Sequence, residues 1–156
     1  MNAPQYQAVV TAPGFSLGLA CNGDEITAID FLEPQPEQAP TVLLAKEAVR
    51  QLRAYLHDPS FAFSLPLAPA GTPFQRRVWA KIAAIPTGRT RSYGEVARDL
   101  ASGPRAVGGA CGANPFPLVV PCHRVVAAAG GMGGFARQRG GFLLDVKRIL
   151  LAHERS

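Results

Sequence analysis

Apolar and polar positions alternate along the first part of the chain with a period of two residues. The alternation runs through three segments, YQAVV at residues 6–10, FSLGLA at 15–20 and ITAIDF at 26–31. This period is typical of half-buried β-strands. The polar stretch CNGDE separates the last two segments and contains Asn22-Gly23, a strong hairpin-turn signal. We therefore predict three short strands, the last two joined by a tight turn.

The period becomes helical after the proline-rich stretch EPQPEQAP at residues 33–40. Apolar residues then recur three or four positions apart until Pro59 ends the pattern. The predicted buried face of this helix is formed by Val42, Ala45, Val49, Leu52 and Leu56. The segment FAFSLPL, residues 61–67, is a candidate for a further strand.

A stretch of small residues, APAG at residues 68–71, is the predicted linker between two domains. Residues 1–67 are predicted to form a small α/β domain. Residues 72–156 are predicted to form a second, mainly helical domain.

Helix start and stop signals dominate the second domain. Thr72 followed by Pro73 predicts a helix start, with a buried face formed by Phe74, Val78, Ile82 and Ile85. Ser92 and Glu95 have the spacing of a capping box and predict a short helix. A Ser-Gly-Pro turn then leads into a further helix, RAVGGACGA at residues 105–113. Two short helices joined by a glycine-containing turn suggest a helix-turn-helix.

The second helix of this pair breaks two local rules. Arg105 lies near its positive N-terminal end, and Gly108 and Gly109 lie in its interior, at a cost of roughly 1 kcal/mol each relative to alanine. Glycines let a backbone approach another surface closely, and an arginine at the leading end can enter a groove or fill a gap in a base stack. Packing of the glycines against a neighbouring helix is the alternative, and the sequence fits both interpretations.

The formal net charge of +5 is unevenly distributed. Residues 1–69 contain three basic and seven acidic residues, whereas residues 70–156 contain 13 basic and four acidic residues. Such an excess of cations suits a polyanionic partner, in particular nucleic acid. A basic surface that serves only solubility is the alternative.

Membrane and secretory classes find no support in the sequence. No apolar run approaches the roughly 20 residues of a membrane span, and the first ten residues lack a signal-peptide pattern, so we expect a cytoplasmic protein. The three cysteines, Cys21, Cys111 and Cys122, form no CxxC pair. We therefore expect neither a disulfide framework nor a metal site, and each cysteine is either a small core residue or a working thiol.

Cys122 and His123 stand side by side in the apolar run FPLVVPCHRVV. In an extended backbone adjacent side chains point to opposite sides, so direct contact between sulfur and imidazole is unfavourable and a bridging water is needed. His123 would then accept the thiol proton through this water and leave a nucleophilic thiolate. A buried cysteine beside a structural histidine is the alternative.

Glu154, near the end of the predicted C-terminal helix FLLDVKRILLAHE, is a candidate to orient this histidine. An acid at the negative end of a helix is unfavourable unless it has a partner. His123 is one candidate partner. A solvated glutamate at a frayed terminus is the alternative.

Six motifs, TPFQ..VW, IP.G.T.SY, RAVGGA, NP, PCHRV and K..LLAHE, follow one another between residues 72 and 154. With these motifs the chain resembles the O6-alkylguanine-DNA alkyltransferases, which repair DNA by transferring an alkyl group to their own cysteine. The resemblance implies an α/β plus mainly α architecture. A small RNase H-like N-terminal domain, matched only in layout, would be followed by a winged-helix-like helix-turn-helix domain.

The resemblance implies roles for five residues of the acceptor site. Cys122 is the expected alkyl acceptor, His123 its water-linked base, and Glu154 the carboxylate that holds the histidine. Asn114 is expected to brace the active-site turn. The hydroxyl of Tyr93 is expected to donate toward the guanine ring as the base leaves.

The resemblance also implies a DNA-binding face and a base pocket. Arg105 is expected to replace the extruded nucleotide in the minor groove, and the other expected DNA contacts are Thr90, Ser92, Ala106, Gly109 and Ala110. The pocket is expected to comprise Tyr93, Cys122, Val125, Phe135 and Ala136. Phe135 and Ala136 stand where the family commonly has a tyrosine and a small, often hydroxyl-bearing residue, and the stretch from Gly130 to Lys147 is longer than usual. Arg124 is expected to support the site structurally.

The implied reaction uses no cofactor or metal. A lesion inside a duplex must be extruded, at a cost of a few kcal/mol, before the thiolate can displace guanine from the alkyl carbon. The thioether product is a poor leaving group, so we expect one turnover per molecule. The expected partner is double-stranded DNA containing O6-alkylguanine, with O4-alkylthymine as a further substrate, and the protein is expected to be a monomer.

Two other functions compete with this one. A non-enzymatic sensor of alkylated guanine would bind the lesion without repair, but relatives of that type replace the cysteine that this chain retains. A cysteine hydrolase would need a histidine in direct contact with sulfur and an oxyanion site, neither of which the sequence displays.

Overall fold

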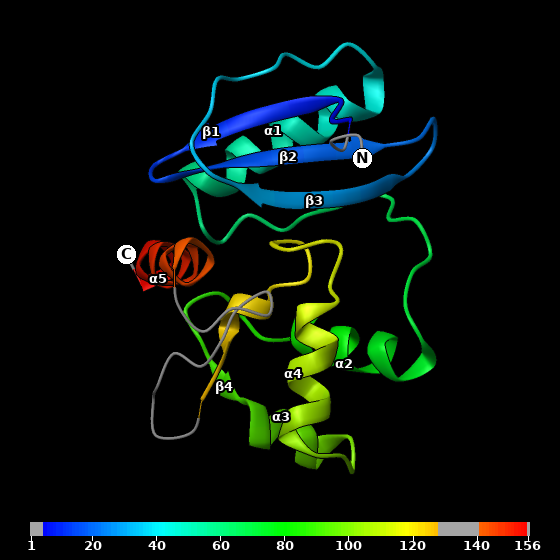
Figure 1. Ribbon diagram of the computed structural model, residues 1–156, viewed down its shortest axis with the longest axis vertical. Coiled ribbons are helices and arrows are strands. Elements are labelled where there is room, and N and C mark those ends of the chain that lie inside the picture. The colour runs from blue at the N-terminus through cyan, green and yellow to red at the C-terminus, as the bar shows by residue number, and fades with distance from the viewer. Residues whose placement is uncertain (1–4, 128–140, 156) are drawn as a thin grey trace. The chain divides into compact units, whose positions relative to one another are not determined.

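The chain divides into two units, Met1–Pro69 and Ala70–Ser156. The computed structural model describes residues 5–127 and 141–155. Its helices and strands follow one another in Figure 1. Both units contain strands and helices, so the predicted mixture of α and β structure is confirmed.

The first unit is built on an antiparallel sheet of three strands in the order β1-β2-β3. The strands are β1 (Ala8–Ala12), β2 (Phe15–Cys21) and β3 (Ile26–Leu32), as the alternating pattern predicted. The turn after β2 is held by Asn22, whose side-chain oxygen accepts from the backbone N–H of Glu25 at 2.7 Å.

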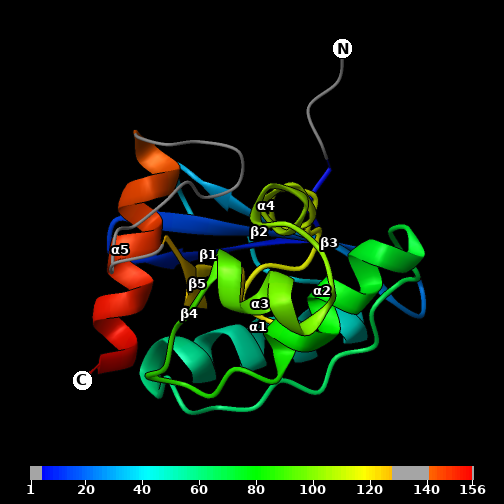
Figure 2. The ribbon, with the colours of Figure 1, turned by 90° about the horizontal axis from the view of Figure 1, so that it is seen from below.

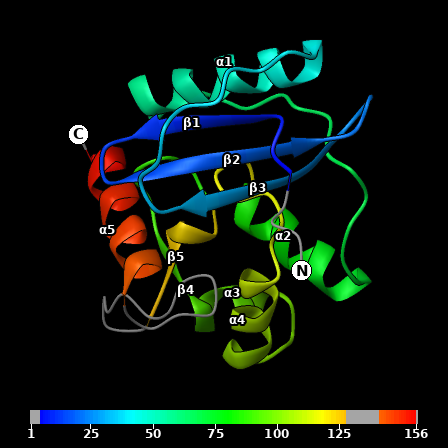
Figure 3. The same cartoon turned by 45° about the horizontal axis from the view of Figure 1, so that its top comes forward.

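Helix α1 (Leu43–His57) packs against β1 and β2, and Figure 3 shows it along one face of the sheet. On the predicted face of the helix Ala45, Val49 and Leu52 are buried and Leu56 is half-buried, whereas Val42, at the N-cap, is exposed. The candidate strand at 61–67 is wrong. Only a single bridge joins Leu67 to Ile26, because Pro66 has no N–H to extend a ladder.

The second unit begins with α2 (Pro73–Ala83). Thr72 and Gln75 form a capping box at its start, which confirms the predicted helix boundary. Along its predicted buried face Val78, Ile82 and Ile85 are buried, and Phe74 is half-buried.

The predicted pair of short helices is present in the second unit. Helix α3 (Tyr93–Asp99) starts with the expected capping box of Ser92 and Glu95, and α4 (Pro104–Gly112) follows after a turn. Figure 2 shows α4 almost end-on beside α3 and α2, and residues of all three helices are in contact. Trp79 of α2 is buried, and its indole N–H donates to the carbonyl of Ala110 on α4 at 2.8 Å.

The segment that carries Cys122 differs from the prediction. It was expected to be extended, but Cys122–Arg124 forms a 3₁₀ turn (η1). Prolines at positions 115, 117 and 121 remove backbone donors, so a regular strand cannot form until β5 (Val125–Val126), which pairs in parallel with β4 (Arg91–Ser92).

Helix α5 (Phe142–Arg155) completes the second unit and packs against the 3₁₀ turn. Its buried residues recur at helical spacing and include two that carry charge, Lys147 and Glu154. Within residues 5–127 and 141–155, no helix has the length and apolar character needed to cross a membrane.

Candidate active site

The sulfur of Cys122 lies at the first residue of the 3₁₀ turn and is almost completely buried. The side-chain amide of Asn114 lies 3.3 Å from this sulfur and donates to the carbonyl of Val120 at 2.9 Å. The amide oxygen of Asn114 accepts from the backbone N–H of Phe116, also at 2.9 Å. One side chain therefore contacts both the sulfur and the backbone that leads to it.

Beside the cysteine, His123 is 1% exposed, and its Nε2 lies 2.8 Å from Oε2 of Glu154. The sequence left Glu154 either paired with His123 or solvated at a frayed terminus. The pairing is correct, because the Glu154 side chain is 2% exposed and α5 continues through it.

The imidazole of His123 is held as a neutral base. Burial is the largest cause that lowers its pKa, the charges of Arg124 and Lys147 lower it further, and Glu154 acts in the opposite direction. An ionised carboxylate can only accept, so Nε2 carries the proton and Nδ1 keeps its lone pair. That Nδ1 atom is buried and has no hydrogen-bond partner within the described residues.

The thiol of Cys122 needs such a base. A hydrogen bond with Cys111 and then burial raise its pKa well above the usual value, whereas Asn114 and Lys147 lower it less. Cys111 was expected to be packed within its helix; it is buried and also raises the pKa of Cys122. In the described part of the chain no hydrogen bond joins this sulfur directly to the imidazole, so proton transfer between them requires a mediator.

Arg124 does more than the sequence indicated. Its Nε donates to Oε1 of Glu154 at 2.8 Å and its Nη2 to Oε2 at 2.9 Å. The same guanidinium donates to the carbonyl of Ile85 and to the hydroxyl of Thr87. It therefore links the end of α5 to the turn that follows α2.

Sequence reasoning missed Lys147, which was quoted only as part of a motif. Its side chain is fully buried, its ammonium donates to the carbonyl of Val125 at 2.8 Å, and burial lowers its pKa to about 8. The same ammonium lies 5.7 Å from the ring centroid of Tyr93, the first residue of α3. A lysine in register with Leu144, Leu150 and Leu151 on the apolar face of α5 is the signal that would have identified it.

The expected DNA-binding residues lie at different depths. Arg105, Ala106 and Gly109 are exposed on α4, and a Cβ atom added to Gly108 or Gly109 would meet nothing within 4 Å. The alternative in which these glycines pack against a neighbouring helix is therefore wrong. The prediction that Ala110 contacts DNA is wrong, because Ala110 lies on the opposite face of α4 with Val107 and is only 2% exposed.

The remaining residues predicted to contact DNA or the base lie in different surroundings. Thr90 is exposed, and Ser92 is half-buried with its hydroxyl engaged by the backbone N–H of Glu95. Val125 is fully buried in β5, next to the ammonium of Lys147. Phe135 and Ala136 lie outside the described residues. Over residues 5–127 and 141–155, no group of three histidine, cysteine or acidic side chains is placed to hold a metal ion.

A buried cysteine, a neutral histidine paired with a glutamate and two short helices in one basic unit fit a protein that acts on nucleic acid through a thiol. Comparison with known proteins supports this class. The family model for the DNA-binding domain of 6-O-methylguanine DNA methyltransferase matches residues 73–156. The methylated-DNA--protein-cysteine methyltransferase of Methanosarcina acetivorans is 44% identical over 159 residues, which cover 97% of this chain and 99% of that protein.

Solved structures lead to the same family. Mycobacterium tuberculosis OGT in complex with DNA matches with a TM-score of 0.79 at 39% identity, covering 94% of this chain and 91% of that one. An O6-methylguanine DNA methyltransferase from Methanococcus jannaschii matches with a TM-score of 0.66 at 25% identity, over 94% and 92% of the two chains. The chain belongs to the 6-O-methylguanine DNA methyltransferase family.

Proposed function

We propose that this protein repairs DNA by extruding O6-alkylguanine and transferring the alkyl group irreversibly to Cys122. The observation that carries the proposal is the buried Nδ1 of His123, which has no hydrogen-bond partner among the described residues and belongs to the neighbour of a cysteine whose thiol is protonated at rest. One water molecule between Nδ1 and the sulfur would pass the thiol proton to the imidazole, and Glu154 would stabilise the resulting cation.

The transfer step is balanced within this site. The thiolate forms a bond to the alkyl carbon, the bond from that carbon to O6 breaks, and the electron pair leaves with guanine. A hydrogen bond from the Tyr93 hydroxyl would stabilise the developing charge on the base, and the nearby ammonium of Lys147 would strengthen this donor. The thioether of Cys122 has no proton to lose, so each molecule reacts once.

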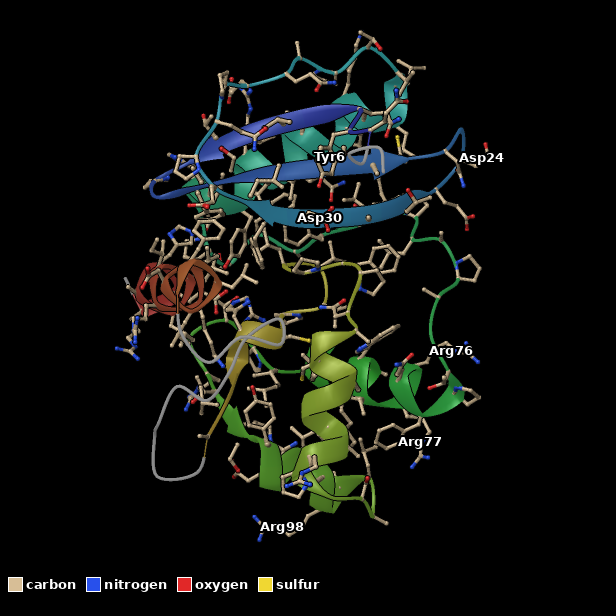
Figure 4. The ribbon with its side chains drawn as sticks, viewed as in Figure 1. Tyr6, Asp24, Asp30, Arg76, Arg77 and Arg98 are labelled. Atoms are coloured by element: carbon tan, nitrogen blue, oxygen red, sulfur yellow. The ribbon has the colours of Figure 1, made fainter. Side chains whose placement is uncertain are left out.

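DNA binding is assigned to the basic second unit. Arg105, at the exposed start of α4, would occupy the space of the extruded nucleotide, and the small residues Ala106 and Gly109 would allow close approach to the minor groove. Figure 4 shows Arg98 pointing away from α3, where it can reach phosphates. Thr90 and Ser92 are the other proposed contacts.

Several finer expectations are part of the same proposal. We propose an RNase H-like first domain and a winged-helix-like second domain, divided at residues 68–71, because the family resemblance implies them. Cytoplasmic location, a monomeric state and activity on O4-alkylthymine are proposed on the same basis, as is a base pocket that includes Phe135 and Ala136.

Incubation of the protein with a duplex containing O6-methylguanine tests the proposal. The peptide that carries Cys122 is expected to gain one methyl group, detected by mass spectrometry, while the same peptide from Cys122→Ser stays unmodified. An intact lesion despite tight binding would instead indicate a sensor. Loss of the lesion without modification of the protein would indicate another enzyme.

A further inference from the structure

The carboxylate of Glu154 is shared between two neighbours on the 3₁₀ turn. His123 is hydrogen-bonded to Oε2, and Arg124 donates to both Oε1 and Oε2. All three distances lie between 2.8 and 2.9 Å. These side chains are largely or completely removed from water. Three ionisable groups are therefore packed at a position where net charge is costly.

Charge balance decides the state of this cluster. Arginine keeps its proton at any physiological pH, so an ionised Glu154 already balances one full charge. With a neutral His123 the cluster has no net charge, whereas protonation of the imidazole would leave a buried excess cation. The positive charge of Lys147, on α5, also disfavours the imidazolium and lowers the pKa of His123.

The geometry around Arg124 is fixed from a second direction. Its Nη1 donates to the carbonyl of Ile85 at 2.6 Å and its Nη2 to the hydroxyl of Thr87 at 3.2 Å. The turn continues through Gly88 at a φ of +80°, where a Cβ atom would lie 3.3 Å from the backbone oxygen of Glu154. The turn thus contacts both the guanidinium and the end of α5.

We propose that Arg124 is a positioning residue for the base, holding Glu154 ionised and balanced so that His123 stays neutral with Nδ1 unprotonated. This inference rests on the proposed function and goes beyond it. It assigns the unprotonated state of the His123 base to Arg124 as well as to the His–Glu pair. Without Arg124 the carboxylate would lose both guanidinium contacts, and its negative charge would favour the imidazolium more strongly. An imidazolium has no lone pair at Nδ1 and cannot accept the thiol proton.

The test uses the full chain as wild type, Arg124→Met, Arg124→Lys and a matched control, Arg148→Met. Arg148 lies on the exposed side of α5 in an ion pair with Asp145. Two readouts are needed: the pH dependence of the single-turnover transfer rate, and ¹⁵N NMR of the His123 ring nitrogens. A merely structural salt bridge would change folding or the maximal rate, but neither the acid limb of the pH profile nor the protonation of Nδ1.

In wild type and in Arg148→Met, Nδ1 is expected to remain unprotonated at neutral pH. In Arg124→Met it is expected to gain a proton there, and the acid limb of the rate profile should move up by roughly one pH unit. Arg124→Lys keeps the positive charge but loses the paired N–H donors of the guanidinium. The acid limb of its pH profile should therefore stay at the wild-type position, with a lower maximal rate.

Should Arg124→Met fail to fold, Arg124→Lys and Thr87→Val still test the inference. Both retain the positive charge and are expected to leave Nδ1 unprotonated. A folded Arg124→Met with the wild-type limb and an unprotonated Nδ1, or protonation of Nδ1 in Arg124→Lys, would overturn the proposal. If wild type transfers no alkyl group, the proposed function fails, whereas the NMR measurement still decides the role of Arg124.

Discussion

At the scale of single residues, the site combines a thiol that holds its proton with a base that lacks one. The pKa of Cys122 is raised, mainly by Cys111 and by burial, and the pKa of His123 is lowered, mainly by burial. Neither group alone would make a nucleophile at neutral pH. The proposed chemistry therefore requires a mediator that couples the two groups at the moment of attack.

Cys111 should control how tightly Cys122 holds its proton. Replacement Cys111→Ala removes the hydrogen bond that is the largest cause of the raised pKa, so the pKa of Cys122 is expected to fall. The measurement is the pH dependence of carbamidomethylation by iodoacetamide, read at the Cys122 peptide by mass spectrometry. Cys111→Ser keeps a hydrogen-bonding group and should lie closer to wild type. An unchanged midpoint in Cys111→Ala would contradict this role.

Lys147 should make stability depend on pH in a defined direction. Its pKa is lowered from 10.5 to about 8 by burial, so between these values the unfolded chain binds more protons, and the free energy of unfolding rises with pH. This contribution is at most about 3 kcal/mol.

Denaturant unfolding at about pH 7.5 and about pH 10 measures this effect. The stability of wild type relative to Lys147→Met is expected to increase at the higher pH. Lys81→Met, which changes a partly exposed lysine on α2, should show no such trend. A pH-independent difference between wild type and Lys147→Met would exclude a neutralised lysine.

At the scale of elements, signals local in sequence were sufficient to predict much of the fold. Capping residues and apolar spacing located α2 and α3 because cap and capped N–H groups are only three residues apart. The hydrogen bonds of Arg124 to Glu154 could not be predicted. They join residues separated by 30 positions, which no local pattern encodes.

The candidate site followed a similar division. The adjacent pair Cys122 and His123 was visible as a motif, whereas the depth of each small residue on α4 was not. Ala106 and Ala110 have the same chemistry, but one is exposed and the other buried, because that depends on which face meets α2 and α3.

The exposed face of α4 should tolerate side chains in the free protein but not on DNA. Gly109→Leu adds a side chain into open space and replaces glycine within a helix, so stability is expected to be unchanged or to rise by up to about 1 kcal/mol. Affinity for duplex DNA should fall, since the side chain would separate the backbone from the groove. Fluorescence anisotropy measures this, with Ala80→Leu at an exposed site on α2 as control. Equal affinities of Gly109→Leu and wild type would place DNA elsewhere.

At the scale of the whole molecule, charge and chemistry reside in the same unit. Residues 70–156 hold 13 of the 16 lysines and arginines together with Cys122, His123 and Glu154. This unit can therefore both attract a polyanion and modify it. The first unit, with its excess of acidic residues, contributes none of the proposed site residues.

The most direct measurement of the central claim is a titration of the protein with increasing amounts of O6-methylguanine duplex, in which restored guanine and methylated Cys122 are both counted. If Cys122 accepts the alkyl group irreversibly, both counts are expected to rise together and to stop at one per protein molecule. Guanine restored beyond that ratio, or restored without methylation of Cys122, would contradict transfer to this thiol.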